Sequence, residues 1–121
     1  MTISMFQASV PVFIRALNNL GAARLAGAEF PAYEDNETTF ANLVTRIHNT
    51  VKYLETLQPA QIDGSEDRTI SWQSRSSTKS MQGQPYLFSH LLPNVHFHVA
   101  TAYNILRHNG IQVGKKDFLG P

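Results

Sequence analysis

The sequence predicts a mainly α-helical bundle, and two amphipathic segments with one clear helix end carry this prediction. The cleanest apolar pattern lies at residues 38–57, and the longest lies at residues 85–108. Both segments repeat apolar residues three and four positions apart, which turns one face of a helix toward a core. Asn109-Gly110 then supplies a left-handed C-terminal cap. With an amphipathic N-terminal segment, we expect an up-and-down bundle of three long helices.

The N-terminal segment predicts a helix over about residues 3–26. Its apolar stripe consists of Val10, Phe13, Ile14, Leu17 and Leu20. The stripe weakens after Leu20, where Gly21 costs about 1 kcal/mol relative to alanine in a helix interior. We therefore expect a seam near residue 21. Pro11 has two interpretations, since Ser9 can be an N-cap with Pro11 in the first turn, or an earlier helix is kinked there.

The second helix is expected over about residues 38–57, after a turn-rich connector at residues 28–37 and before Pro59, which ends it. One face is apolar and is expected to face the core: Phe40, Leu43, Val44, Ile47, Val51, Leu54 and Leu57. The other face is polar and is expected to face solvent: Thr45, Arg46, Asn49, Lys52 and Glu55. His48, beside the apolar face, is interpreted as a partly exposed boundary residue.

A small β flap is expected within the polar segment 58–84. Residues 68–72 alternate like a half-buried strand, and residues 78–81 can pair with them across a serine-rich turn. Ile70 and Trp72 would pack this flap. A segment this long without structure is unusual in a compact domain, which also favours the flap.

The last long helix is expected over residues 85–108, kinked at Pro93 because proline disrupts a helix interior and the residue before it. One face carries Leu91, Val95, His98, Ala102 and Ile105. His98 therefore lies in the middle of an apolar face, where a titratable group is unexpected. The tail at residues 111–121 is expected to be extended, with Phe118 and Leu119 docked on the bundle.

Composition bounds the function. The 121 residues form one domain and carry 10 Lys and Arg against 9 Asp and Glu, so no basic stripe favours nucleic acid. Cysteine is absent, which excludes disulfides and thiolate chemistry. The apolar runs are shorter than the roughly 20 residues of a membrane span. We expect a cytoplasmic protein that binds neither nucleic acid nor membrane.

Most of the chain resembles a known family. The segments are MTISMFQASVPVFIRALNNL at 1–20, AARLAGAEFPAYEDNETTFANLVTRIHNTVKYLETL at 22–57, and LLPNVHFHVATAYNILRHNGIQVGKKDFLG at 91–120. Together they are similar to a group of uncharacterised bacterial and fungal proteins in the DinB-like superfamily of four-helix bundles. The resemblance implies a DinB-like bundle, and it implies no specific reaction, because the function of this group is unassigned.

One large departure from that family lies at Leu20-Gly21-Ala22. Members carry there the end of the first helix, a loop and most of the second helix, which this chain lacks. An incomplete gene model or splice form, a three-helix variant, and a swapped oligomer all explain the gap, and we favour an incomplete sequence. A missing helix would leave an apolar face open, so a homodimer through that face is the partner that we expect.

The resemblance also implies a metal hypothesis. DinB-like enzymes hold a divalent metal with three histidines, two of them spaced four residues apart on the last helix. His98 falls on the second of that pair and Asn94 on the first, and a neutral amide is a poor ligand for zinc, nickel or iron. Three hypotheses follow, and the third is an interaction module that presents an open groove, which applies only if the second helix is truly missing. The first is a non-catalytic domain with a structural His98, which we favour, with no cofactor and no assignable catalytic residue. The second is a metal-dependent transferase or hydrolase that uses His98.

Overall fold

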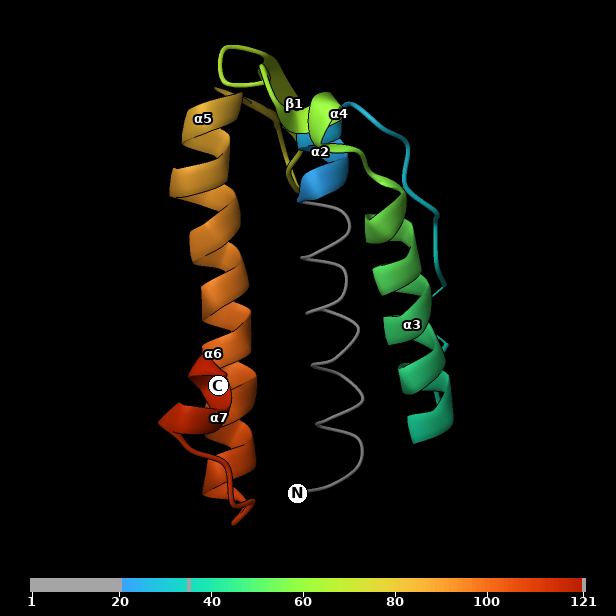
Figure 1. The fold of residues 1–121 in the computed structure, drawn as a ribbon, viewed down its shortest axis with the longest axis vertical. Coiled ribbons are helices and arrows are strands. Elements are labelled where there is room, and N and C mark those ends of the chain that lie inside the picture. The colour runs from blue at the N-terminus through green and yellow to red at the C-terminus, as the bar shows by residue number, and fades with distance from the viewer. Residues whose placement is uncertain (1–20, 35, 121) are drawn as a thin grey trace.

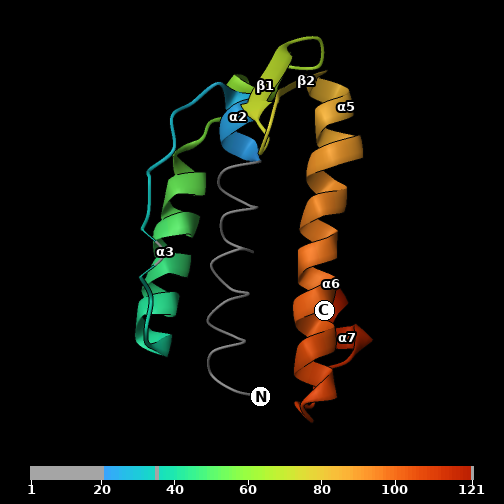
Figure 2. The ribbon, with the colours of Figure 1, turned by 180° about the vertical axis from the view of Figure 1, so that it is seen from behind.

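The computed structural model describes residues 21–34 and 36–120, and predictions for residues 1–20, 35 and 121 lie outside it. Within the described part, the protein is mainly α-helical with a small two-stranded sheet. The two long helices, α3 (Phe40–Thr56) and α6 (Leu92–His108), run lengthwise on opposite sides of the molecule (Figures 1 and 2). The flap lies at one end, between them in sequence. The expected fold class is therefore confirmed.

Helix α2 (Ala22–Ala26) is the described part of the expected first helix, whose apolar stripe lies outside the described residues. Gly21 precedes it with φ −106° and ψ −124°, outside the helical region. Gly27 ends it with φ 63°, a left-handed cap that favours glycine. Ala23 and Leu25 are buried, so α2 is short but well packed.

Helix α3 begins after Thr39, whose side chain accepts a hydrogen bond from the backbone N–H of Asn42. The prediction that the apolar face of this helix packs against the core is wrong for most of its length. Its buried residues are Leu43, Arg46 and Thr50. Much of the apolar face is exposed instead: Phe40 at 53%, Val44 at 50%, Ile47 at 43% and Val51 at 46%. The helix turns its Arg46 side toward the connector, where polar contacts hold it.

The flap is present as expected. Strands β1 (Thr69–Gln73) and β2 (Thr78–Gln82) pair antiparallel, with Ile70 opposite Met81 and Trp72 opposite Lys79. Helix α4 (Pro59–Ile62), a short element that the sequence did not predict, precedes the flap. The main core cluster joins the flap to the helices and consists of Leu25, Ile70, Trp72, Tyr86 and Leu91.

The last long helical segment begins earlier than Pro93 and changes its winding on the way. Helix α5 (Gly83–Pro85) leads into a π-helical segment (Tyr86–Leu91), which leads into α6. Pro93 falls in the first turn of α6, where its missing N–H is tolerated. The local adjustment expected at Pro93 thus takes the form of wide π turns just before it.

The tail is not fully extended, which corrects the expectation for residues 111–121. Helix α7 (Lys115–Leu119) forms because the Asp117 carboxylate accepts a hydrogen bond from the Gly114 N–H at 2.7 Å and so caps its first turn. Phe118 contacts the Tyr103 ring edge-on, with centroids 5.2 Å apart. Leu119 is 68% exposed, so only one of the two expected docking residues makes this kind of contact.

Candidate functional site

The connector between α2 and α3 is held against α3 by polar groups. Arg46 Nη1 donates to the carbonyl oxygen of Glu34 at 2.9 Å and forms an ion pair with Glu37 Oε1 at 2.6 Å. Further along the helix, the Tyr53 hydroxyl donates to the carbonyl oxygen of Glu29 at 2.8 Å. These contacts attach the connector to α3 at both of its ends.

The Arg46–Glu37 pair is almost completely shielded from solvent. The side chains are 5% and 6% exposed, respectively. The guanidinium group also lies over the Tyr33 ring, with its carbon 4.8 Å from the ring centroid. Such a buried pair needs close, well-satisfied geometry, because both charges lose their hydration. Here a cation–π contact and a backbone carbonyl add to the ion pair.

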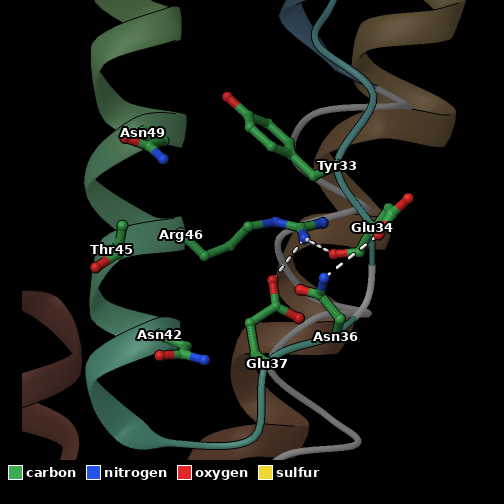
Figure 3. Close-up of a pocket in the computed structure, with 8 residues that line it drawn as sticks. All are labelled: Tyr33, Glu34, Asn36, Glu37, Asn42, Thr45, Arg46 and Asn49. Atoms are coloured by element: carbon green, nitrogen blue, oxygen red, sulfur yellow. Dashed lines mark hydrogen bonds and ion pairs between the residues drawn. The ribbon is translucent and has the colours of Figure 1, made fainter.

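A pocket of about 300 Å³ lies beside this pair, between the connector and α3 (Figure 3). Its lining is polar apart from the ring of one tyrosine: Tyr33, Glu34, Asn36, Glu37, Asn42, Thr45, Arg46 and Asn49. The volume is at the lower end of the range for small-ligand sites. One carboxylate oxygen here, Glu37 Oε2, is buried and has no hydrogen-bond partner. The pocket lining therefore includes a hydrogen-bond acceptor that has no donor.

Sequence reasoning missed this pocket because it placed Arg46 on the solvent face of α3. A periodicity argument shows which residues share a face, but it does not show what covers that face. The signal that was available was the group of acidic residues in the connector, Glu34 and Glu37 among them. Acidic residues at this position also favour the start of the following helix, but Glu37 instead pairs with Arg46.

The residues singled out on the last helix lie on the expected stripe. His98 and Val95 are half-buried, and Leu91 is buried. Asn94 is also half-buried, and its Nδ2 atom is buried without a hydrogen-bond partner. The imidazole of His98 lies edge-on to the Phe97 ring, at 5.4 Å between centroids. The helix thus carries polar groups on its inner side, as the sequence indicated.

A second histidine on this side has a more distinctive environment. The His90 ring lies 4.7 Å from the Trp72 ring and 5.5 Å from the Tyr86 ring, centroid to centroid. Tyr86 is fully buried and accepts a hydrogen bond from Arg24 Nη1 at 3.4 Å. The Nε2 atom of His90 is buried without a hydrogen-bond partner. The imidazole of His90 therefore lies where three elements meet: the flap, α2 and the π-helical segment.

The environment of His90 favours its neutral form. Burial lowers its pKa below the ordinary value of 6.5, and the positive charges of Arg24 and Lys79 lower it further. Burial also raises the pKa of the Tyr86 phenol above 10.0, although Arg24 opposes this shift. Both rings therefore stay uncharged near neutral pH and act as packing groups.

We expect His90 to make the protein sensitive to acid. Because the pKa of His90 is lower in the folded state, the unfolded state binds more protons as the pH falls below about 6.5. The free energy of unfolding should be highest above this pH. It should fall as the pH drops from the pKa of His90 in the unfolded state to its lower pKa in the folded state. Urea midpoints at pH 8, 7, 6 and 5 measure the slope. His90→Phe should flatten it, and the exposed-site variant His48→Phe should not.

Comparison with known proteins decides the family. Residues 18–119 match the family described as "Domain of unknown function (DUF1993)". This chain belongs to the DUF1993 family. The DUF1993 chain is also similar to the crystal structure of a DinB family member protein from Shewanella denitrificans, with 38% sequence identity and a TM-score of 0.84. A comparison with curated proteins gives no match.

The DUF1993 chain is shorter than this structural relative. The alignment covers 95% of the chain and 65% of the relative. About a third of the relative thus has no counterpart in this chain. The predicted gap after Leu20 stays a prediction. The DinB-like bundle itself is shown by the similarity.

The DinB-like superfamily implies a metal, and the described residues do not fit one. No group of three or more His, Asp or Glu side chains gathers anywhere in residues 21–34 and 36–120. Residues 1–20 contain none of these residue types, as the sequence shows. The buried Nε2 of His90 and Nδ2 of Asn94 are polar atoms without partners, yet they do not complete a three-ligand set. A metal role for His98 and Asn94 stays a prediction of the resemblance.

Proposed function

We propose that this DUF1993 chain is a helical assembly domain that acts by binding rather than by catalysis, and that its partner is a second copy of itself. One observation carries the proposal. Three aliphatic side chains on α3, Val44, Ile47 and Val51, are each between 43% and 50% exposed. We call these three residues the α3 stripe.

The spacing of the α3 stripe is suited to packing against a second helix. Steps of three and four residues place the three side chains along one line of the helix, which is the pattern of a helix-packing seam. No charged residue falls within this line. Phe40, which is 53% exposed, extends the same face toward the N-terminus of α3. A contiguous apolar face of this kind on a monomer marks an interaction site.

A second copy is the occupant that the structure favours. A bundle closes its core with helices on every side, and about a third of a DinB-like relative's chain has no match in this protein. The same stripe on another copy can supply the missing apolar surface through a two-fold contact. With antiparallel helices, Ile47 of one copy lies near Ile47 of the other, and Val44 lies near Val51. Their helix dipoles then oppose one another favourably.

The proposal predicts a dimer that one substitution separates. Ile47→Lys places two ammonium groups across the two-fold axis in an apolar contact, and we expect the dimer Kd to rise about 100-fold or more. Ala41→Lys is the matched control, because it adds the same charge to an exposed site about 90° around α3. Sedimentation velocity across a concentration series measures both variants against the unchanged chain.

Two results would contradict the proposal. The first is an unchanged chain that stays monomeric at about 100 µM, well above an ordinary dimer Kd, with a cooperative melt above about 50 °C. The second is a dimer that Ile47→Lys leaves intact.

We propose no reaction for the chain. A metal-dependent transferase or hydrolase that uses His98 remains the alternative raised by the family resemblance, and no described geometry favours it. No described helix is long and apolar enough to cross a membrane. A cytoplasmic location stays a prediction of the sequence.

A further inference from the structure

A second pocket, of about 280 Å³, lies between the flap and the π-helical segment. Its lining consists of Trp72, Lys79, Ser80, Met81 and His90. Two of these side chains are aromatic rings, one is a thioether and one carries an ammonium group. No carboxylate is among the five. The pocket therefore combines apolar walls with one positive charge.

The strand register explains why an ammonium group lies beside these rings. Residues directly opposite one another in an antiparallel pair share a face of the sheet. Trp72 lies opposite Lys79, as Ile70 lies opposite Met81. Ile70 and Trp72 are 4% and 8% exposed, so this face is the one that packs on the core. Lys79 thus leaves the flap on its core-facing side, although its side chain is exposed.

The charges around this pocket favour an anion. No carboxylate in residues 21–34 or 36–120 forms an ion pair with Lys79. Arg24 adds a second cation nearby, with its guanidinium carbon 5.9 Å from the centroid of the Trp72 ring. Burial lowers the pKa of His90, and the positive charges of Arg24 and Lys79 lower it further. Both cations therefore act on the same small region, where an anion would be attracted.

The walls of the pocket suit a planar, apolar group. The rings of Trp72 and His90 lie 4.7 Å apart, centroid to centroid, and are tilted by 30°. Since Trp72 is mostly buried, a ligand meets an edge of its ring, which is a favourable geometry for an aromatic contact. The thioether of Met81 also packs well on aromatic groups. The Nε2 atom of His90 is shielded from solvent, so a ligand contacts the imidazole ring and not this nitrogen.

We propose that this pocket binds a small aromatic carboxylate, whose carboxylate pairs with the Lys79 ammonium and whose ring packs against Met81 and Trp72. The volume of about 280 Å³ limits the ligand to a small molecule. The pocket lies at the flap, whereas the α3 stripe lies on a separate helix (Figures 1 and 2). Binding and self-association are therefore separate properties.

Sodium benzoate is the probe, titrated into the full 121-residue chain at constant ionic strength. Trp72 is the only tryptophan in the sequence, so its indole N–H gives a single resonance in ¹⁵N–¹H spectra. This resonance should shift saturably, with a Kd on the order of 1 mM for so small a ligand. Benzamide keeps the ring without the charge and should bind about threefold more weakly. Acetate keeps the charge without the ring and should bind about tenfold more weakly.

Variants of two exposed flap residues locate the binding. Lys79→Gln removes the ammonium group, so the affinity for benzoate should fall about threefold or more. Its affinity for benzamide and its thermal melt should stay as they are in the unchanged chain. Lys79→Arg keeps the charge and should keep most of the benzoate affinity. Arg75→Gln, which removes the same charge from the exposed turn of the flap, is the matched control and should bind benzoate as the unchanged chain does.

Three results would overturn the proposal. One is an indole resonance that shows no saturable shift with benzoate. Another is equal binding of benzamide or of acetate. The third is a benzoate affinity that Lys79→Gln leaves unchanged or lowers no more than Arg75→Gln does, since the ammonium group of Lys79 would then not hold the carboxylate.

Discussion

Replacing Gly83 by alanine is expected to disrupt the junction between the flap and the last helical segment. A Cβ atom at Gly83 would lie 1.9 Å from the carbonyl oxygen of Ser65 and 2.8 Å from its carbonyl carbon. These are backbone atoms, so a rotamer change cannot relieve the clash. The neighbouring hydrogen bond from Gln84 N–H to the Glu66 carbonyl at 2.9 Å holds the two segments together. One of them must move before the methyl group fits.

The expected cost of Gly83→Ala is at least about 3 kcal/mol, the upper end for overpacked sites. The melting temperature should fall by about 10 °C or more. Gly114→Ala is the control, because a Cβ there meets only the Asp117 carboxylate at 3.8 Å. Its stability should change by less than about 0.5 kcal/mol. Denaturant midpoints compare the two. If Gly83→Ala is as stable as the control, the backbone of Ser65 lies farther from residue 83 in solution than it does in the structure.

The importance of Gly83 was not predictable from the sequence. The residue belongs to the polar segment 58–84 in which the flap is expected, and Ser65 lies 18 positions earlier. Local patterns report backbone preference and periodicity over one or two turns. A close approach between distant segments depends on tertiary packing, which a single sequence does not contain. The flap strands are different, because the alternation around Ile70 and Trp72 is itself local.

The same distinction explains the two long helices. On the last one, the expected inner stripe holds, with Leu91 buried and His98 half-buried. On α3 the apolar face was recognised, but the structure covers the Arg46 side and exposes the Val44 side. A helix hides its apolar face only if something is available to pack against it. The connector packs against the polar side of α3 through hydrogen bonds and an ion pair. The sequence alone does not show which segment, if any, packs against the apolar side.

The histidines illustrate where a family resemblance helps and where it misleads. It directed attention to His98 on the apolar stripe, which the described residues leave without a ligand set. His90, two turns earlier, has the stronger perturbation, because Trp72 of the flap and Tyr86 enclose it. Its environment required knowledge of how the flap folds back on the helix.

Arg46→Met is expected to be the most destabilising single change on α3. It removes the partner of a carboxylate that is only 6% exposed and removes the hydrogen bond to the Glu34 carbonyl. Leaving one member of a buried ion pair alone costs about 3–5 kcal/mol. This is a large part of the roughly 5–15 kcal/mol that stabilises a domain of ordinary size. Urea unfolding measures the loss.

A double variant separates the cost of a stranded charge from the cost of lost packing. In Arg46→Met with Glu37→Leu, no buried charge remains and the apolar side chains can pack on Tyr33, so we expect most of the loss to be recovered. The coupling between the two sites should then be about 2 kcal/mol or more, as for residues in direct contact. The exposed-site variant Lys52→Met should change stability by less than about 0.5 kcal/mol. If the two single losses simply add, the Glu37 carboxylate is hydrated in solution, and the connector is held to α3 by Tyr53 and Tyr33 rather than by the ion pair.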